Sequence, residues 1–267
     1  MALVPWTYNN PHTLDSKSPL RSLPLCGRNL RVLQDFSDEI TVHQNTHRKL
    51  WDGAFLLAKY LETQFPESSS FWRKWRKRHN IVKAVELGAG CGLVGMTASL
   101  LGADEVRLTD DAEGIGHTKK CVEANREALN GDAASNGGSI VHDEGNTLKN
   151  GALSSINKKI SCDVLDWCEG PSVWDKTFSL NSYHLVLGSD IIYSNDERIL
   201  NGLLDAIDYL SNADSLILFS YKPRGLGEDV FFKMAESRGF NVEIIDRSLH
   251  PKEFFGSDYQ IISLKKT

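Results

Sequence analysis

The sequence predicts an α/β fold in which helices cover both faces of a mostly parallel sheet of seven strands. Short apolar runs alternate along the chain with segments whose apolar residues recur every three or four positions, the pattern of strands alternating with helices. A glycine-rich turn joins the first of these strands to a helix. The 267 residues are 41% hydrophobic and 24% charged, a composition that provides one sizeable core.

The first fifty residues are predicted to form an N-terminal arm. Residues 1–25 are rich in Pro, Ser and Asn, so we expect irregular structure there. Residues 29–42 alternate loosely between apolar and polar side chains, which indicates a short hairpin or edge strands. A single domain is expected from residue 51 to residue 267, because no second core-sized segment is left over.

The elements of this domain follow from the spacing of apolar residues. Strands are expected at residues 84–87, 106–109, 162–165, 185–188, 215–221, 242–245 and 260–264. Helices are expected at residues 51–65, 93–101, 111–130, 195–210 and 228–237. Gly102 suits the position just past a helix end, and the spacing of Ser194 and Glu197 predicts a capping box. Strands that alternate with helices form right-handed βαβ units on a parallel sheet.

Two segments between these elements are predicted to lie at the surface. Residues 131–159 are rich in Gly, Asn, Ser and Asp, which indicates a flexible insertion. Residues 71–80 carry a run of Lys and Arg around Trp72 and Trp75. We interpret this run as a solvated helix face anchored by the two tryptophans, although a nuclear-import or nucleic-acid patch has the same composition.

Charge and hydropathy limit the class of partner and the compartment. The formal net charge is −5 and the sequence pI is about 5.9, whereas a nucleic-acid-binding module usually has a basic face. We therefore expect no nucleic-acid partner. No apolar run in the sequence is long enough to span a bilayer, so we expect no membrane partner either. The expectation is a monomer of the cytoplasm, with the nucleus as a second compartment.

Cysteine and histidine spacing predicts no metal site. The five cysteines are scattered without a CxxC pair, which fits neither a zinc site nor a disulfide framework and favours a reducing compartment. Among the eight histidines, His43 and His47 come nearest to a ligand spacing, and we attribute their relation to chance. Cys91 lies within the glycine-rich turn, but nothing near it in the sequence indicates a nucleophile.

The glycine-rich turn, Gly88-Ala89-Gly90-Cys91-Gly92, is predicted to bind a cofactor. The missing Cβ atoms allow a tight turn and the close approach of a ligand, and the start of the following helix offers free N–H groups. A strand-to-helix turn needs a glycine for its conformation alone. Three alternating glycines nevertheless favour a ligand site on a Rossmann-like sheet.

The glycine-rich turn alone does not decide between two cofactors, S-adenosylmethionine and a nicotinamide dinucleotide. Gly90-x-Gly92-x-x-Gly95 also matches the dinucleotide pattern, and Asp110 at the end of the second strand would hold a ribose in either case. Glu86, just before the turn, favours S-adenosylmethionine, since an acid suits a cationic cofactor and repels a pyrophosphate. Counted from Gly88, the position of the third glycine of the dinucleotide pattern is taken by Leu93. A nicotinamide-dependent oxidoreductase remains the alternative.

The segment from Asp190 to Tyr193 is predicted to carry the chemistry. An acid at the carboxyl end of a buried parallel strand points into the ligand crevice, where Asp190 would hold and orient a lysine ammonium. The ring of Tyr193 would form a wall that attracts the cationic amine. Burial favours the loss of the proton that the amine must release, whereas an adjacent carboxylate opposes it. A helix-capping role is the alternative for Asp190.

Several stretches resemble the seven-strand protein-lysine methyltransferases known as methyltransferase-like family 16. These are residues 50–62, 85–95, 108–110, 165–167 and 187–193, and the last is similar to the family's DxxY motif. The resemblance extends from about Trp51 to the C-terminus. The opening Met-Ala-Leu-Val-Pro and Trp51-Asp-Gly-Ala54 are most similar to the methyltransferase-like 21 group. The resemblance implies transfer of a methyl group from S-adenosylmethionine to a lysine of another protein, such as an Hsp70-type chaperone or a translation factor.

The resemblance also implies roles for individual residues. Trp51 would pack by the methionine end of the cofactor, and Asp110 would accept hydrogen bonds from the ribose. Backbone contacts would come from Gly88, Ala89 and Gly90, and the adenine and methionine sides would be lined by Trp167 and Ser189. Two features depart from the family: the insertion is longer, and Ser189 stands where Ala is common.

Two further alternatives are weighed against this function. A non-catalytic partner-binding domain of the same fold would have lost cofactor affinity, and the intact glycine turn argues against it. A nucleic-acid amino-methyltransferase typically carries an Asn/Asp-Pro-Pro-aromatic segment where this chain has Asp190-Ile-Ile-Tyr193, and no Pro-Pro pair occurs in the sequence.

Overall fold

The structure is a computed structural model that describes residues 17–36, 46–130 and 159–266. The predicted insertion, up to residue 158, and the part of the predicted hairpin after residue 36 lie outside the described residues. Among the helices of the described residues, none is long and apolar enough to cross a membrane.

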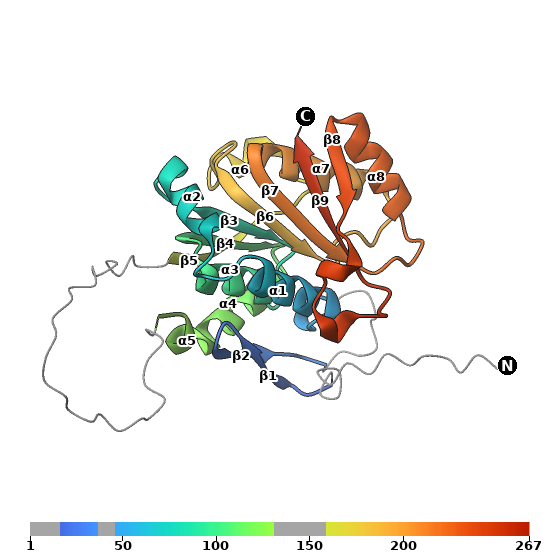
Figure 1. Cartoon of the computed structure of the whole chain (residues 1–267). Helices are drawn as coiled ribbons and strands as arrows, with labels where there is room; N and C mark the ends of the chain where they lie inside the picture. Colours follow the sequence, from blue (N-terminus) through green and yellow to red (C-terminus); the bar gives the residue numbers. More distant parts are fainter. Residues whose placement is uncertain (1–16, 37–45, 131–158, 267) are drawn as a thin grey trace, which may run out of the picture.

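A seven-stranded sheet forms the centre of the molecule (Figure 1). Its strands lie in the order β5 (Lys159–Val164), β4 (Glu105–Asp110), β3 (Lys83–Leu87), β6 (Tyr183–Ser189), β7 (Ser211–Tyr221), β9 (Gln260–Lys266) and β8 (Phe240–Ile244). All neighbouring pairs are parallel except the two that involve β9, which are antiparallel. The predicted α/β fold is confirmed.

Helices cover both faces of this sheet. One face is covered by α1 (Asp52–Gln64), α3 (Leu93–Leu101) and α4 (Ile115–Ala124), and the other by α6 (Pro171–Trp174), α7 (Glu197–Leu210) and α8 (Glu228–Ser237). The described residues include the short 3-10 helices η2 (Thr46–Arg48), η3 (Arg247–Leu249) and η4 (Lys252–Phe254), which lie in connections. Successive strand residues face opposite cores: Ala84 packs with the first set of helices and Val85 with the second.

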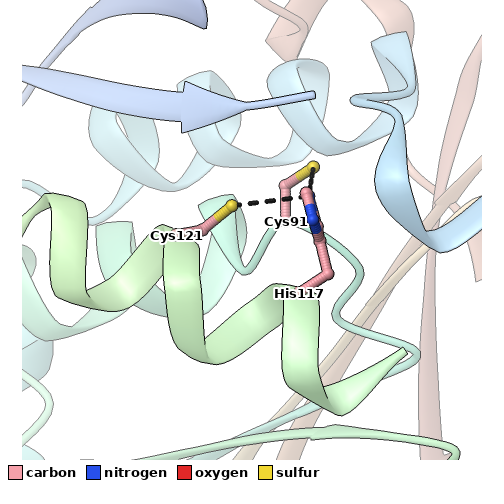
Figure 2. Close-up of side chains that lie close together, drawn as sticks. All are labelled: Cys91, His117 and Cys121. Carbon is pink, nitrogen blue, oxygen red and sulfur yellow. Dashed lines mark hydrogen bonds between the residues drawn. The ribbon is translucent and has the colours of Figure 1, made fainter. Parts of the chain in front are cut away.

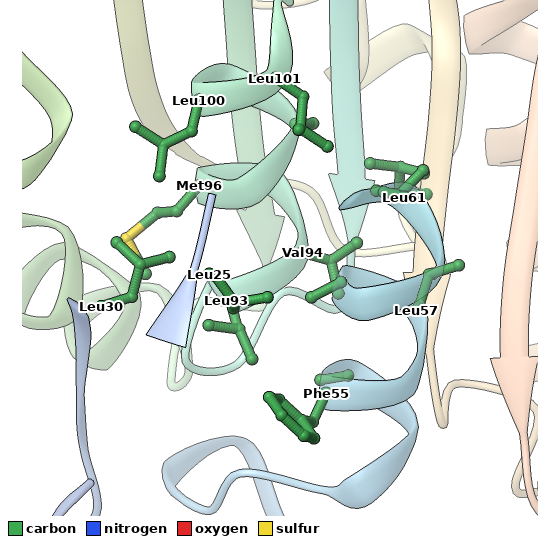
Figure 3. Packing of buried hydrophobic residues seen from close by; sticks show 14 of the residues in the cluster. Leu25, Leu30, Phe55, Leu57, Leu61, Leu93, Val94, Met96, Leu100 and Leu101 are labelled. Carbon is green, nitrogen blue, oxygen red and sulfur yellow. The ribbon is translucent and has the colours of Figure 1, made fainter. Parts of the chain in front are cut away.

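An N-terminal hairpin adds a further layer to the first core. Its strands, β1 (Leu20–Leu25) and β2 (Arg28–Leu33), pair antiparallel. Leu25 and Leu30 are buried against α3, where Met96 lies beside Leu30 (Figure 3). The prediction of irregular structure up to residue 25 was therefore wrong for β1. Side chains alternate between the two faces of this strand, so Leu23 and Leu25 lie on the core while Ser22 and Pro24 are exposed.

The helix predicted over residues 111–130 is broken at Asn125 into α4 and α5 (Arg126–Asn130). The Asn125 side chain accepts a hydrogen bond from the Arg31 N–H at 2.7 Å and donates to the Arg31 carbonyl at 2.6 Å. The Asn125 side-chain amide thus bonds both backbone groups of Arg31 in β2, as a neighbouring strand would. Long-range pairing with the hairpin thus interrupts a segment whose periodicity alone indicates one helix.

Two other predictions concern helix ends and the basic run. The start of α7 is capped by Asp196, whose carboxylate accepts from the Arg198 N–H at 2.9 Å, so the predicted capping box was wrong. The basic run forms α2 (Ser70–His79). Trp72 is buried and its indole N–H donates to the Phe65 carbonyl at 2.8 Å, while most basic side chains are exposed. The solvated, anchored helix face is confirmed.

The strand order has a switch point at β3. From β3 the chain passes through α3 to β4 on one side, whereas β6 pairs with β3 on the other side. Connections that depart in opposite directions leave a crevice at the carboxyl ends of the strands. The fold therefore places a binding cavity next to the glycine-rich turn.

Candidate active site

A cavity of about 480 Å³ lies at the carboxyl ends of β3, β4 and β6. This volume is within the range of small-molecule and cofactor sites. All predicted site residues except Glu86 line it: Trp51, Gly88, Ala89, Gly90, Asp110, Trp167, Ser189, Asp190 and Tyr193. The structure thus brings together side chains from segments that are far apart in the sequence.

The glycine-rich turn forms the floor of the cavity at the end of β3. Gly88 and Gly90 have φ values of +56° and +51°, which residues with a Cβ adopt only with strain. A Cβ on Gly88 would lie 2.7 Å from a methyl carbon of Ile191. Both the conformation and the space therefore require glycine at this position.

The backbone amides of this turn are used within the chain. The Ala89 N–H donates to the Thr109 carbonyl at 2.8 Å, and the Gly90 N–H donates to the Asp110 carboxylate at 2.7 Å. Both residues line the cavity, and their amides fix the turn against β4.

Asp110 is held at the end of β4 by backbone donors. One carboxylate oxygen accepts from Gly90, and the other accepts from the Asp111 N–H at 2.9 Å. Burial raises the pKa of Asp110, while the hydrogen bond from Gly90 lowers it. Since each oxygen of an ionised carboxylate has two lone pairs, acceptor capacity remains for hydroxyl groups in the cavity.

Glu86 lies beneath the turn and does not line the cavity. Its side chain is fully buried, and one oxygen accepts from the Gly95 N–H at 2.7 Å within α3. Burial raises its pKa to about 8, although the Gly95 hydrogen bond lowers it. The predicted contact between this acid and a cationic cofactor is corrected: Glu86 holds the start of α3, and its low-dielectric position disfavours the negative charge.

The described residues contain unpartnered polar groups at the cavity wall that fit a nucleoside cofactor. The indole nitrogen of Trp167 and Nε2 of His47 are buried without a hydrogen-bond partner, and both residues line the cavity. Buried polar atoms without partners are uncommon and indicate a ligand or water. Around them, aromatic side chains offer a surface for adenine, and the Asp110 carboxylate offers acceptors for ribose hydroxyls. The glycines let the backbone approach a ligand closely. These residues therefore fit S-adenosylmethionine.

Asp190 occupies a strained position at the end of β6. Its φ is +53°, in the left-handed region that few residues other than Gly, Asn and Asp adopt. Its N–H donates to the Ser220 carbonyl at 2.8 Å, which connects this turn to β7. Strain of this kind persists only where the surrounding structure holds it, and it concentrates at functional sites.

Both oxygens of the Asp190 carboxylate have partners in the chain. One accepts from the Gly53 N–H at 3.1 Å at the start of α1, and the other accepts from the Arg224 guanidinium at 3.2 Å. Burial raises the pKa of Asp190, whereas Arg224 lowers it. A Cβ on Gly53 would lie 2.2 Å from the Asp190 carboxylate, so this close approach requires glycine.

Arg224 lines the cavity and was missed by the sequence analysis. It follows β7, and its guanidinium carbon lies 5.7 Å from the centre of the Trp51 ring. No motif marks it. Its only signal is that it follows the carboxyl end of a parallel strand, where ligand-binding residues gather.

Trp51 and Tyr193 form the rim of the cavity. They are 41% and 52% exposed, unusually high for large aromatic residues. The Trp51 indole N–H donates to the Thr46 carbonyl at 2.9 Å, which fixes the ring. Of the two histidines whose spacing we attributed to chance, His47 lines the cavity and His43 lies outside the described residues.

The chain is similar to known protein-lysine methyltransferases. A model of the lysine methyltransferase family matches residues 29–137 and 143–238. Protein N-lysine methyltransferase METTL21A of Mus musculus is 28% identical over 243 residues, which cover 91% of this chain and 88% of that protein. EEF1A lysine methyltransferase 3 of Xenopus tropicalis is 29% identical over 224 residues, which cover 84% of this chain and 77% of that protein.

A solved structure shows the same fold. The 16S rRNA N2 G1207 methyltransferase RsmC of T. thermophilus, in complex with AdoMet and guanosine, has a TM-score of 0.50 and 13% identity. The match covers 94% of this chain and 46% of that one. The sheet and its covering helices are therefore those of a methyltransferase fold.

Proposed function

Because the chain belongs to the lysine methyltransferase family and is an S-adenosylmethionine-dependent protein-lysine N-methyltransferase, we propose that its acceptor lysine is received by Asp190. The family decides against the nicotinamide oxidoreductase that the glycine pattern left open. The single observation that supports the acceptor site is the strained, buried Asp190 carboxylate at the cavity, next to Arg224.

The cofactor half of the site consists of the glycine-rich turn, Asp110 and Trp167. When bound, S-adenosylmethionine supplies a sulfonium methyl group as the electrophile. The Asp110 carboxylate accepts hydrogen bonds from the ribose hydroxyls, and Gly88 lets the backbone lie close to the cofactor. The indole N–H of Trp167 gains the partner that it lacks within the chain.

Asp190 orients the acceptor amine, and Arg224 adjusts its protonation. Methyl transfer is an in-line displacement, so much of the rate comes from holding a neutral amine in position. A lone carboxylate would stabilise the protonated amine and raise its pKa. Pairing with Arg224 neutralises that carboxylate, so the amine loses its proton more readily while the unused lone pairs of Asp190 still direct it.

Trp51 and Tyr193 guide the lysine side chain. Their rings flank the entrance to the cavity, where the apolar stem of a lysine packs against aromatic surface. The ring face of Tyr193 also attracts the amine while it is still cationic. The rim therefore favours a long, flexible cationic side chain over a rigid or acidic one.

The substrate is proposed to be an Hsp70-type chaperone or a translation factor. One relative is named as a lysine methyltransferase of EEF1A, and the opening residues resemble the methyltransferase-like 21 group. The purified protein, labelled S-adenosylmethionine and a cell lysate would be incubated together, and labelled proteins identified by mass spectrometry. We expect label on lysine of one or a few proteins in these two classes.

The control for this experiment is Asp190→Asn, which keeps the size and backbone preference of Asp190 but not its charge. We expect it to label none of these proteins. Label that survives in the control, that resides on another residue type, or that is released by ribonuclease would contradict the proposed acceptor site.

A further inference from the structure

Cys91, His117 and Cys121, here called the Cys–His cluster, lie together beneath the glycine-rich turn (Figure 2). Cys91 belongs to the turn, whereas His117 and Cys121 lie one helical turn apart on the same side of α4. Their ligand atoms all lie within 4.8 Å of one another, and all three residues are buried. The sequence analysis missed this cluster because Cys91 is distant in the sequence from the other two residues.

The Cys–His cluster converges on one backbone oxygen. His117 Nε2 lies 3.0 Å from the Leu33 carbonyl oxygen at the end of β2. The sulfurs of Cys91 and Cys121 lie 3.6 and 3.7 Å from the same oxygen. A carbonyl oxygen has two lone pairs, so it satisfies at most two of these three donors well. The three side chains therefore converge on one carbonyl oxygen, and both sulfurs also lie within hydrogen-bond reach of His117 Nε2.

The distances match a tetrahedral metal site. With Zn–S near 2.3 Å and Zn–N near 2.0 Å, tetrahedral geometry separates a sulfur from a nitrogen ligand by about 3.5 Å. The sulfurs of Cys91 and Cys121 lie 3.7 and 3.6 Å from His117 Nε2. A carbonyl oxygen as fourth ligand would lie about 3.6 Å from each sulfur. The Leu33 oxygen has this separation from both sulfurs. Its distance to Nε2 would lengthen by a few tenths of an ångström, and the two sulfurs, which lie within 4.8 Å of each other, would be about 3.8 Å apart.

Ligand type and charge select the ion. Thiolate and imidazole ligands in tetrahedral geometry favour Zn²⁺ or Cu⁺ over hard cations. Two thiolates and one neutral imidazole give a neutral site with Zn²⁺ but a negative one with Cu⁺. Since the cluster is buried, the neutral site has the lower desolvation cost.

We propose that the Cys–His cluster binds one Zn²⁺ ion, with the Leu33 carbonyl oxygen as the fourth ligand. Binding releases the two thiol protons to solvent, and the imidazole coordinates through Nε2 with its proton on Nδ1. The ion joins the hairpin, the cofactor turn and α4. It acts as a structural brace under the cavity and takes no part in methyl transfer.

The test measures metal directly and does not depend on methylation. The full chain would be purified with a phosphine reductant, loaded with Zn²⁺, dialysed and analysed for zinc by atomic emission. We expect about one zinc per chain. Co²⁺ in place of Zn²⁺ should give the visible bands of a tetrahedral ion and the ultraviolet absorption of sulfur-to-cobalt charge transfer. Absence of bound zinc, or a cobalt spectrum without sulfur bands, would overturn the proposal.

Matched cysteine variants locate the site. Cys121→Ser should weaken zinc affinity by more than about 100-fold, beyond the loss typical of an outer-shell partner. Cys162→Ser, which removes a half-buried cysteine outside the cluster, should leave the affinity unchanged. Equal affinity in both variants would place the ion elsewhere. If Cys121→Ser does not fold, the wild-type cobalt spectrum still decides. A two-dalton mass loss after purification without reductant, with no zinc binding under reducing conditions, would identify a disulfide instead.

Discussion

The two halves of the cavity are built differently. At the ends of β3 and β4, Asp110 and the glycine-rich turn are held by bonds to backbone amides. At the ends of β6 and β7, Asp190 is held in a left-handed conformation and is paired with Arg224, whose side chain is 26% exposed. The first half is fixed before any ligand arrives, whereas the second contains a side-chain ion pair that an incoming amine can rearrange.

This difference suits the ligands that we propose for each half. A cofactor of constant shape is bound best by a preorganised surface, because little ordering remains to be done on binding. A lysine on a large substrate arrives with its charge and must lose a proton, so the groups that meet it have to respond to that charge. The comparison predicts separate losses of cofactor binding and of turnover, and the substitutions below test that separation.

The largest effect is expected for Asp190→Ala. We expect methylation to fall by roughly 100-fold or more, because the acceptor amine loses the group that positions it. The affinity for S-adenosylhomocysteine should stay close to wild type, since Asp110 and the glycine-rich turn are untouched. Calorimetry and single-turnover assays measure the two quantities. Equal losses in both would place Asp190 in the cofactor half and remove the distinction.

Gly53→Ala should act on the same half without removing a polar group. The added Cβ would displace the Asp190 carboxylate, and a misplacement of about 1 Å costs on the order of 100-fold in rate. Gly116→Ala is the matched control, because a Cβ there meets nothing within 4 Å. Turnover would be measured alongside the melting temperature. Full activity in Gly53→Ala would show that the position of the carboxylate is not critical.

Asp110→Ala should weaken cofactor binding. Loss of charge-assisted hydrogen bonds to the ribose costs roughly 1.5–3 kcal/mol, or about 10- to 150-fold in affinity for S-adenosylhomocysteine. At saturating cofactor, turnover should recover towards the wild-type value. An unchanged affinity in a folded variant would remove Asp110 from the cofactor half.

Arg224→Met should shift the pH dependence of turnover. Burial raises the pKa of Asp190 and Arg224 lowers it, so without Arg224 the carboxylate takes up a proton at a higher pH. The amine also keeps its proton to a higher pH, because an unpaired carboxylate stabilises it. Both effects move the acidic limb of the kcat profile upward, by about one pH unit. Lys222→Met, which removes an exposed ion pair with Asp258, is the control. An unshifted profile would contradict the neutralising role.

The smallest effect is expected for Glu86→Gln, which tests the support of the cofactor half. The pKa of Glu86 is about 8 in the folded chain and near 4.5 when unperturbed. Between these values the unfolded chain has lost a proton that the folded chain retains, so stability falls as pH rises. Glutamine does not titrate, so the variant avoids this fall in stability, but its side chain buries an unpaired amide N–H. The titration of Glu86 costs about 4 kcal/mol at pH 7.5 and the unpaired amide about 3 kcal/mol, so we expect a net gain of about 1 kcal/mol at pH 7.5 that reverses to a net loss towards pH 4.5. Urea unfolding at both pH values measures it.

The same division governs what the sequence predicts. The cofactor half follows from local patterns: a strand, three glycines, a helix and an acid after the next strand. These elements follow one another along the chain from β3 to the end of β4. In the acceptor half Asp190 and Tyr193 were found through a strand end and a family motif, and Trp51 was found through the family resemblance, which placed it beside the cofactor. Arg224 and Gly53 act on Asp190 from segments 34 and 137 residues away, so no local pattern indicates them.

The errors in the fold prediction have the same physical origin. The break at Asn125 depends on Arg31, which is 94 residues away, and the strand β1 depends on the packing of its leucines against α3. Glu86 was misplaced for a related reason: its position before the turn was clear, but the direction of its side chain depends on α3. Periodicity predicts which elements form, and long-range hydrogen bonds decide their ends and their contacts.

The Asp190 carboxylate is bound to Gly53 at the start of α1, and the Ser220 hydroxyl on β7 is bound to the carbonyl of the same glycine. These bonds span 137 and 167 residues of chain. During synthesis, when domains emerge at about 5–20 residues per second, the N-terminal segments leave the ribosome well before β7 does. A nascent chain therefore completes its cofactor turn early but lacks its acceptor pocket until translation is nearly finished. The order of synthesis therefore delays activity until β7 has joined α1.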